Sequence, residues 1–495
     1  MSIRSGFVNY SRREARFARR IGVVAVMSLA LSACGGGAGD DTPEPPPNDP
    51  PIVVPPVPDQ PVIETPVVET PVVNVDDPTQ CNVATQNQWA YNFMTDGYLF
   101  YDQVPVVDPQ SYDSPNALVR DVRFAERDDF SNVSNATRSS LAFEEGREFG
   151  LGFRIRRDAQ NIRRFATVLD DSPFGRAGVE RGDIPLSING LSVDDEQLGE
   201  IFQTQVIGTP DSPATSTWRI QKRGTGEVQE LQFTTAEYNI NTVVGLNTFS
   251  GGGLSGNVGY LAFDRFLETS EAELDNALNF FVEANIQELI LDMRYNGGGR
   301  VSIARLLASV IGGSQLSNQL LMSYEFNDRY SENNFALRFL ESAGQNGLSR
   351  LIVLTTGSTA SASEIVIAGL QPYIDVVVIG QRTTGKPFIS YGYDRCDERL
   401  NVIEAEGFNQ AGNSVFGGIE PTCFAEDDLS NDLGLKPDNR GFEGMLQSAI
   451  EYIESGRCDV APVIVANAES LDRSGKGVDD SLLQGITIVE GAFAD

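Results

Sequence analysis

Apolar residues in the second half of the chain switch repeatedly between the spacing of strands and the spacing of helices. Short apolar runs predict buried strands at 258–263, 288–293, 351–355 and 375–379. Apolar positions three and four residues apart predict helices at 271–284, 301–310 and 361–370. Strands that alternate with helices favour right-handed crossovers and a largely parallel sheet. The pattern therefore predicts an α/β domain over residues 237–460.

The first half of the chain follows other patterns. Residues 81–144 predict a small helical domain with an aromatic-rich stripe that is typical of a core: Trp89, Tyr91, Phe93, Met94, Tyr98, Leu99 and Tyr101. Residues 145–236 contain short runs of strand type, among them 153–155 and 217–220. Residues 35–80 are rich in proline, which blocks helix and sheet and predicts an extended tether. With residues 461–495 as a C-terminal tail, we expect a multidomain α/β (α+β) protein.

Several short motifs follow one another within residues 145–236. Gly150-Leu151-Gly152-Phe153 comes first, and it is followed in order by Ser172-Pro173, Ala177-Gly178, Gly182-Asp183 and Asn189-Gly190. In this order the motifs resemble a PDZ domain of the bacterial, protease-associated kind. The resemblance implies that the backbone N–H groups of Gly150, Leu151, Gly152 and Phe153 bind the terminal carboxylate of a peptide. The same peptide would pair with the strand that follows.

Charge and the N-terminus indicate where the protein acts. The net charge of −32 argues against a nucleic-acid partner, which needs a basic face. Arginines between positions 12 and 20 precede an apolar run, Ile21–Leu31, that is too short to span a bilayer. Cys34 follows, which is typical of a bacterial lipoprotein signal over 1–34 with Cys34 as the lipidated residue; a plain secretory signal is the alternative. Because Gly35 favours outer-membrane sorting, we expect a lipid anchor at the periplasmic face of the outer rather than the inner membrane.

Four further cysteines bear on covalent cross-links and on metals. Cys81, Cys396, Cys423 and Cys458 allow three pairings in an exported chain. Their positions favour Cys396 with Cys423, which lie in one segment, and Cys81 with Cys458. The chain has no histidine and no Cys-x-x-Cys spacing, so we expect neither a metal nor any other cofactor.

The absence of histidine also limits the choice of a catalytic base. A serine nucleophile needs a neighbouring base, and lysine is the best remaining candidate. Ser361 lies at the predicted start of a helix, and Lys386 follows it by 25 residues. Helix, turn and strand fill this interval, so the loop with Lys386 returns to the edge of the sheet where Ser361 lies. We therefore predict Ser361 as the nucleophile and Lys386 as the general base. Ser358, which could cap the helix, and Ser363 are weaker candidates.

The same edge of the sheet offers groups that could support this chemistry. The backbone N–H of Ala362 is the natural first donor to an oxyanion, and Gly298 or Gly299 after the strand at 288–293 would give the second. Taken alone, these glycines are more typical of an ordinary turn. Lysine must be neutral to act as a base, so we predict that Lys386 is buried in an apolar setting with only hydroxyls and carbonyls as partners. Glu364 either orients Lys386 or a neighbour, or is an ordinary acid in the first turn of a helix.

Three motifs in combination resemble the C-terminal processing peptidases, the family that shares the tricorn-protease core. They are Ser361-Ala362-Ser363-Glu364, Gly385-Lys386 and Asp292-x-Arg294-x-Asn296-x-Gly298-Gly299. The resemblance extends over about residues 85–455. It implies a serine endopeptidase that cleaves unstructured or C-terminal regions of polypeptides through an acyl-enzyme. It also implies the roles of nucleophile for Ser361, base for Lys386 and oxyanion donors for Ala362 and a glycine near Gly298.

The chain departs from this family at a few positions. Gly297 replaces the usual proline of the turn, and Pro387 replaces the common glycine after the lysine. The stretch from Cys396 to Cys423, with a long acidic loop, is similar to an exported branch of the family. Two other functions remain open: a non-catalytic, PDZ-bearing binding module on a protease-like fold, and a hydrolase of non-peptide acyl substrates. The sequence leaves the oligomeric state and any adaptor undetermined.

Overall fold

The computed structural model describes residues 80–251, 253–341, 347–430 and 444–458. All described residues belong to one compact unit of the chain. The predicted signal with Cys34, nearly all of the tether and the C-terminal tail lie outside the described residues. In the described part, no helix combines the length and the apolar character needed to cross a membrane.

The N-terminal region is built from short helices and one strand. Asn82 and Ser114 cap the two longer helices with their side-chain oxygens. The elements are α3 (Val83–Met94), η2 (Tyr101–Gln103), η3 (Pro109–Ser111), α4 (Pro115–Val122), β1 (Asn132–Asn135) and α5 (Ala136–Phe143). The aromatic-rich stripe of this region packs with residues of β17 and β18, including Phe388 and Leu400, which confirms that the stripe is core.

The next segment consists mainly of short antiparallel strands. β2 (Arg147–Gly150) pairs with β9 (Ala236–Asn239), and β3 (Phe153–Arg157) pairs with β4 (Arg163–Val168). A four-stranded sheet has the order β6-β5-β7-β8: β5 (Ile184–Ile188), β6 (Leu191–Ser192), β7 (Thr215–Gln221) and β8 (Val228–Thr234). The helical turns are α6 (Pro173–Arg176), α7 (Leu198–Ile201) and η4 (Phe202–Val206). Phe153, Phe165, Phe174 and Trp218 form an aromatic core, in which Phe153 stacks on Phe174 with ring centroids 4.8 Å apart.

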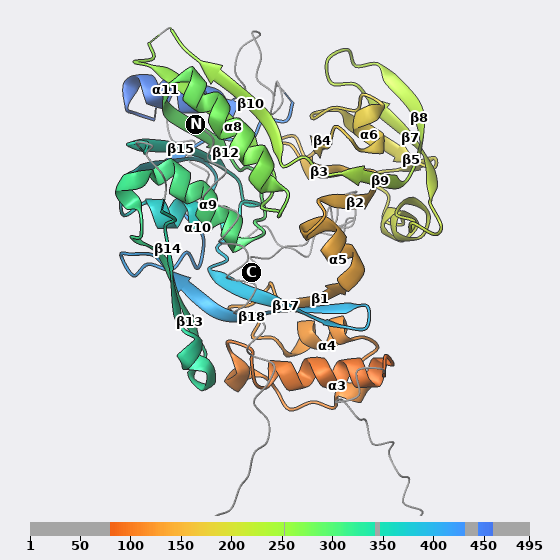
Figure 1. Ribbon diagram of the computed structural model, residues 1–495. Helices are drawn as coiled ribbons and strands as arrows, with labels where there is room; N and C mark the ends of the chain where they lie inside the picture. Colours follow the sequence, from red (N-terminus) through yellow and green to blue (C-terminus); the bar gives the residue numbers. More distant parts are fainter. Residues whose placement is uncertain (1–79, 252, 342–346, 431–443, 459–495) are drawn as a thin grey trace, which may run out of the picture. The chain divides into compact units, whose positions relative to one another are not determined.

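A six-stranded sheet forms the α/β part of the chain (Figure 1). Its order is β10-β11-β12-β15-β16-β19, and all neighbours are parallel except β10 and β11. The strands are β10 (Val243–Phe249), β11 (Asn257–Phe263), β12 (Ile286–Asp292), β15 (Arg350–Thr355), β16 (Asp375–Gly380) and β19 (Cys423–Phe424). The apolar runs therefore predicted β11, β12, β15 and β16 and their parallel arrangement, whereas β10 and β19 were not predicted.

Helices cover both faces of this sheet, which explains why its strands are apolar throughout. Leu289, Leu291, Leu351 and Val353 pack with α8 (Ser270–Ala284), α9 (Val301–Gly312) and α10 (Ala362–Leu370). The alternate residues Ile290, Ile352 and Leu354 pack with α11 (Gly444–Ser455) on the other face. Successive side chains of a strand point to opposite faces, so each face of the sheet has its own core.

A second sheet contains an element that the sequence pattern did not predict. It includes β13 (Leu320–Phe326), β14 (Phe335–Arg338), β17 (Phe388–Arg395), β18 (Glu398–Phe408) and β1 of the N-terminal region, together with η5 (Ser314–Leu316) and η6 (Asp328–Asn333) nearby in sequence. β17 and β18 form a hairpin. Residues 398–408 are thus a long strand, which the sequence analysis did not predict.

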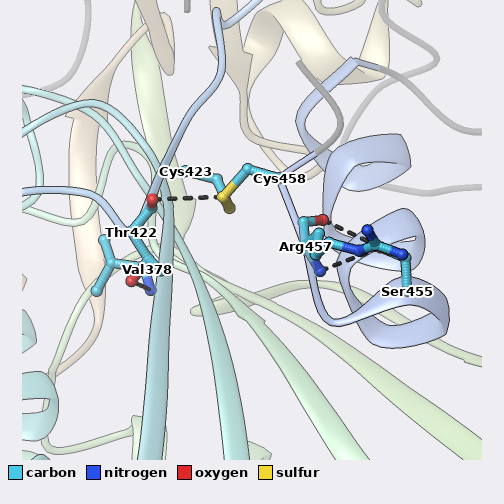
Figure 2. The surroundings of a disulfide bond; sticks show 6 residues. All are labelled: Val378, Thr422, Cys423, Ser455, Arg457 and Cys458. Atoms are coloured by element: carbon cyan, nitrogen blue, oxygen red, sulfur yellow. Dashed lines mark hydrogen bonds between the residues drawn. A yellow bond between two sulfur atoms is a disulfide. The ribbon is translucent and has the colours of Figure 1, made fainter. Parts of the chain in front are cut away.

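The disulfides join other pairs of cysteines than those favoured from the sequence. Cys81 is bonded to Cys396, and Cys423 is bonded to Cys458 (Figure 2). Cys396 lies at the turn of the β17–β18 hairpin, which packs against the N-terminal region, so its partner is next to α3. Cys458 follows α11, which covers the sheet near β19 and Cys423. Nearness in sequence was therefore a poor guide to pairing.

Candidate active site

Ser361 lies in a tight turn between β15 and α10. Its backbone has φ 60° and ψ −114°, a conformation that residues other than glycine rarely adopt. The residue is 1% exposed, and its Oγ has no hydrogen-bond partner among the described residues. A strained turn at a helix N-terminus thus holds a buried serine hydroxyl.

Lys386 lies in the loop that follows β16, at the same end of the parallel sheet as Ser361. It is 3% exposed, so its predicted burial is confirmed. Its Nζ lies over the ring of Phe130, 5.2 Å from the centroid. Phe130 belongs to the N-terminal region, and sequence reasoning missed it, because no local pattern connects residues so far apart in the chain.

Glu364 connects the turn with Ser361 to the loop with Lys386. Its Oε2 accepts hydrogen bonds from the backbone N–H groups of Ser361, at 2.7 Å, and Lys386, at 2.8 Å. Its Oε1 accepts from Gly385 N–H at 2.7 Å and from the Thr383 hydroxyl at 2.5 Å. The sequence left its role open between orienting a neighbour and an ordinary helix acid. The structure shows it bonded to the backbone of both candidate catalytic residues.

The electrostatic state of Glu364 follows from burial and from these four donors. Burial raises the pKa of the carboxyl above its usual value, and the hydrogen bonds from Thr383, Lys386, Ser361 and Gly385 oppose this rise. Thr383 Oγ1 itself accepts from Ile419 N–H at 2.7 Å, so its hydroxyl proton is available for Glu364. All four of these neighbours donate to the carboxyl oxygens, which is the arrangement that suits an ionised carboxylate.

The glycines after β12 lie against the turn of Ser361. At Gly298, with φ 105°, a Cβ would lie 2.8 Å from Ser361 Cβ and 2.9 Å from Ala362 N. At Gly299, with φ 138°, a Cβ would lie 2.1 Å from Phe266 O. Both positions therefore require glycine. The structure brings Gly298, Ala362 and Ser361 together as the sequence predicted.

Not all N–H groups of this cluster are available to a ligand. Gly298 N–H donates to Asn296 Oδ1 at 2.9 Å. Among the residues that the structure describes, the N–H groups of Gly299 and Ala362 have no acceptor. These two N–H groups are the unoccupied donors next to Ser361.

The two other serines of the loop have partners of their own. Ser358 Oγ accepts from Arg156 Nη2 at 3.1 Å, and the residue that caps α10 is Ser361, so Ser358 is not the cap. Ser363 Oγ donates to Asn296 O at 3.0 Å. Arg156 lies in β3, the strand after the Gly150–Phe153 motif.

The Gly150–Phe153 motif forms a bend between β2 and β3, and neither strand pairs with the α/β sheet among the described residues. Gly152 has φ 78°, and a Cβ there would lie 2.0 Å from Ser172 Cβ. Leu151 and Phe153 are buried in the aromatic core of this segment. Among described pairings, β3 has only β4 as a neighbour, so its second edge is unpaired.

Comparisons with known proteins indicate a peptidase family. Residues 257–423 match the model of peptidase family S41, and residues 85–132 match the model of the peptidase S41 N-terminal domain. The chain is 26% identical over 290 residues to a carboxy-terminal-processing protease of Bartonella bacilliformis. The match covers 57% of this chain and 62% of that protein. It is 24% identical over 295 residues to a "Probable CtpA-like serine protease" of Staphylococcus epidermidis, with 59% and 56% covered.

A solved structure is similar over a larger share of the chain. It belongs to a Bacteroides fragilis protein assigned to the S41 proteases, with a TM-score of 0.58 and 25% identity. The match covers 74% of this chain and 97% of that chain. The match to the curated relatives, by contrast, spans about three fifths of their length.

Proposed function

We propose that this chain, which belongs to peptidase family S41, is a serine endopeptidase in which Ser361 is the nucleophile and Lys386 the general base. One observation carries the proposal: a single carboxylate oxygen of Glu364 binds the backbone N–H groups of both residues. The unpartnered Oγ of Ser361 at the start of α10 supports it. The strand–helix–strand path from β15 through α10 to β16 also supports it, because it returns the loop with Lys386 to the end of the sheet where Ser361 lies.

The reaction proceeds in two balanced steps. Ser361 Oγ attacks the peptide carbonyl while its proton passes to Lys386 Nζ, and the carbonyl oxygen becomes an oxyanion. The N–H groups of Ala362 and Gly299 donate to that oxyanion. Lys386 then gives the proton to the leaving amine, and an acyl-enzyme remains. Water then attacks the ester carbonyl while Lys386 takes a proton from it. Lys386 passes this proton to Ser361 Oγ as the ester bond breaks, which releases the new carboxyl terminus and restores the serine hydroxyl.

Burial is what lets a lysine serve as this base. Desolvation disfavours the ammonium form, and Lys386 is 3% exposed. The Phe130 ring 5.2 Å from Nζ contributes to the cover over the amine, although a ring face also attracts a cation. The N-terminal region thus becomes part of the catalytic environment in this proposal.

The segment from β2 to β9 supplies the peptide-binding site in this proposal. Its Gly150–Phe153 bend and the unpaired edge of β3 fit a PDZ domain that binds a terminal carboxylate and adds the peptide as a strand. One relative is named a carboxy-terminal-processing protease. We accordingly propose polypeptide C-termini and unstructured segments as substrates.

The place of action is proposed from the sequence. The basic n-region, the apolar run and Cys34 support export and lipid anchoring, and the proline-rich tether would hold the enzyme away from the membrane. Gly35 supports the outer membrane. Globomycin, an inhibitor of lipoprotein signal processing, tests this: it should cause a larger precursor to accumulate in cells, and an unchanged size would contradict the proposal.

Cleavage by defined variants tests the enzymatic function. The purified chain is incubated with fluorescein-labelled casein, an unfolded protein, beside Ser361→Ala and Lys386→Ala. We expect cleavage by the wild type alone. Equal cleavage by the wild type and Ser361→Ala would refute the nucleophile, and binding of casein without cleavage by any of the three would favour a non-catalytic binding module.

A further inference from the structure

Asn296 lies between the glycine turn and the loop of Ser361, and the proposed reaction makes no use of its side chain. The residue is 0% exposed. Its side-chain Oδ1 and Nδ2 and its backbone carbonyl oxygen each form hydrogen bonds. The partners lie in three separate segments of the chain: the end of β11, the glycine turn and the loop of Ser361. A buried polar side chain is costly unless it is fully bonded, so its presence at this point calls for a reason.

The amide group of Asn296 fixes the glycine turn. Oδ1 accepts from Gly298 N–H at 2.9 Å, and Nδ2 donates to Phe263 O, at the end of β11, at 2.9 Å. Gly298 O in turn accepts from Phe266 N–H at 3.0 Å. Asn296 Oδ1 therefore holds the peptide between Gly297 and Gly298, and Phe266 N–H holds the next peptide, which carries the N–H of Gly299. Because both peptides that flank Gly298 are fixed, the direction of the Gly299 N–H is fixed too.

The backbone carbonyl of Asn296 fixes the other side of the site. It accepts from Ala360 N–H at 3.1 Å and from Ser363 Oγ at 3.0 Å. Ala360 and Ser363 flank the pair Ser361-Ala362 on either side. Asn296 therefore forms hydrogen bonds both to the glycine turn, which carries the N–H of Gly299, and to the loop that carries the N–H of Ala362.

We propose that Asn296 is a positioning residue that sets the geometry between the N–H groups of Gly299 and Ala362. The proposal rests on the proposed peptidase function, in which these two groups bind the oxyanion. Two donors stabilise an oxyanion only when both lie at about 3 Å from the place where the charge develops. A displacement of about 1 Å between them would lower the rate about a hundredfold while leaving substrate binding largely unchanged.

Kinetics separates positioning from a purely structural role. We expect Asn296→Ala to lower kcat about 10- to 100-fold on labelled casein, with KM within about twofold of the wild type. Ser363→Ala removes only the hydroxyl bond to Asn296 O, so it should fold and lower kcat about threefold to tenfold. Asn87→Ala is the matched control. Its side chain, also 0% exposed, donates to Pro109 O and Tyr112 O, which belong neither to the glycine turn nor to the loop of Ser361. It should leave kcat unchanged.

Amide hydrogen exchange tests the same claim without relying on activity. In the full chain, Asn296→Ala and Ser363→Ala should both speed exchange in peptides covering 294–300 and 357–364, whereas Asn87→Ala should not. A folded Asn296→Ala variant with unchanged kcat, or with unchanged exchange over 357–364, would overturn the proposal. If the wild type itself cleaves nothing, the peptidase function fails, and the exchange result alone decides whether Asn296 couples the two loops.

Discussion

Replacing Glu364 by glutamine keeps the size and shape of the side chain that bonds both candidate catalytic residues. The carboxylate accepts from four donors, two on each oxygen. A glutamine amide has only one accepting atom. Whichever way the amide is turned, its NH2 group faces two donors: either the backbone N–H groups of Ser361 and Lys386, or Gly385 N–H and the Thr383 hydroxyl.

The size of the effect follows from this count. A hydrogen bond to a charged group contributes about 1.5–3 kcal/mol, so the loss of two corresponds to about 3–6 kcal/mol. The amide is easier to bury than the carboxylate, whose pKa burial raises, and this offsets part of the loss. We therefore expect the free energy of unfolding to fall by about 3 kcal/mol. The kcat should fall about a hundredfold with little change in KM, because the backbones of Ser361 and Lys386 shift apart.

Urea unfolding and casein cleavage measure the two quantities. Glu404→Gln is the matched control, because Glu404 is also a buried glutamate with two donors, Tyr391 N–H at 3.2 Å and Tyr393 OH at 3.0 Å, but lies in the β17–β18 hairpin. It should leave kcat unchanged. Wild-type kcat and stability in Glu364→Gln would refute the reasoning. Lowered stability with unchanged kcat would make Glu364 a structural helix acid.

Three further changes probe the glycine turn, a buried acid and a disulfide. Gly298→Ala should abolish cleavage, because its Cβ would lie 2.8 Å from Ser361 Cβ. The control is Gly178→Ala, where φ is 77° and a Cβ would meet no atom within 4 Å, so this variant should lower stability but not kcat. Equal kcat in the two variants would contradict this prediction. Burial raises the pKa of Glu404 from 4.5 to about 7, so the folded chain binds this proton more tightly than the unfolded chain does. The resulting stabilisation, about 3 kcal/mol, should be complete below pH 4.5 and lost as the pH rises through 7, and a pH series of urea melts should show this loss in the wild type but not in Glu404→Gln. Cys458→Ser removes the disulfide to Cys423, which closes a loop of 35 residues, and should lower the free energy of unfolding by about 4 kcal/mol. Urea melts under oxidising conditions should show this difference between the variant and the wild type, and it must vanish when both proteins are reduced.

The sequence predicted the elements whose patterns are local. Apolar runs marked the parallel strands, and the interval between Ser361 and Lys386 implied the strand–helix–strand path that the structure contains. Burial of Lys386 followed from the chemistry required of a base. Gly298 lies against Ala362, as expected, and the positive φ of Gly298 and Gly299 explains why glycine occupies both positions.

Contacts between distant segments could not be predicted in the same way. Nothing local to Phe130 indicates that it lies over Lys386, and the mixed composition of 398–408 hid a strand that pairs with β1, β13 and β17. Glu364 has the same sequence signature whether it binds two loops or only favours a helix N-terminus. The disulfides depend on which ends of the fold meet, so the spacing of cysteines left them open.

The pH dependence of covalent labelling at Ser361 tests the central claim that Lys386 activates this serine. A fluorophosphonate probe would be added to the wild type, Lys386→Ala and Ser361→Ala, and the modified residue would be identified by mass spectrometry. We predict a label on Ser361 of the wild type, formed faster as the pH rises and the lysine loses its proton, and almost none on either variant. Labelling of Lys386→Ala at the wild-type rate, or a rate independent of pH, would contradict it.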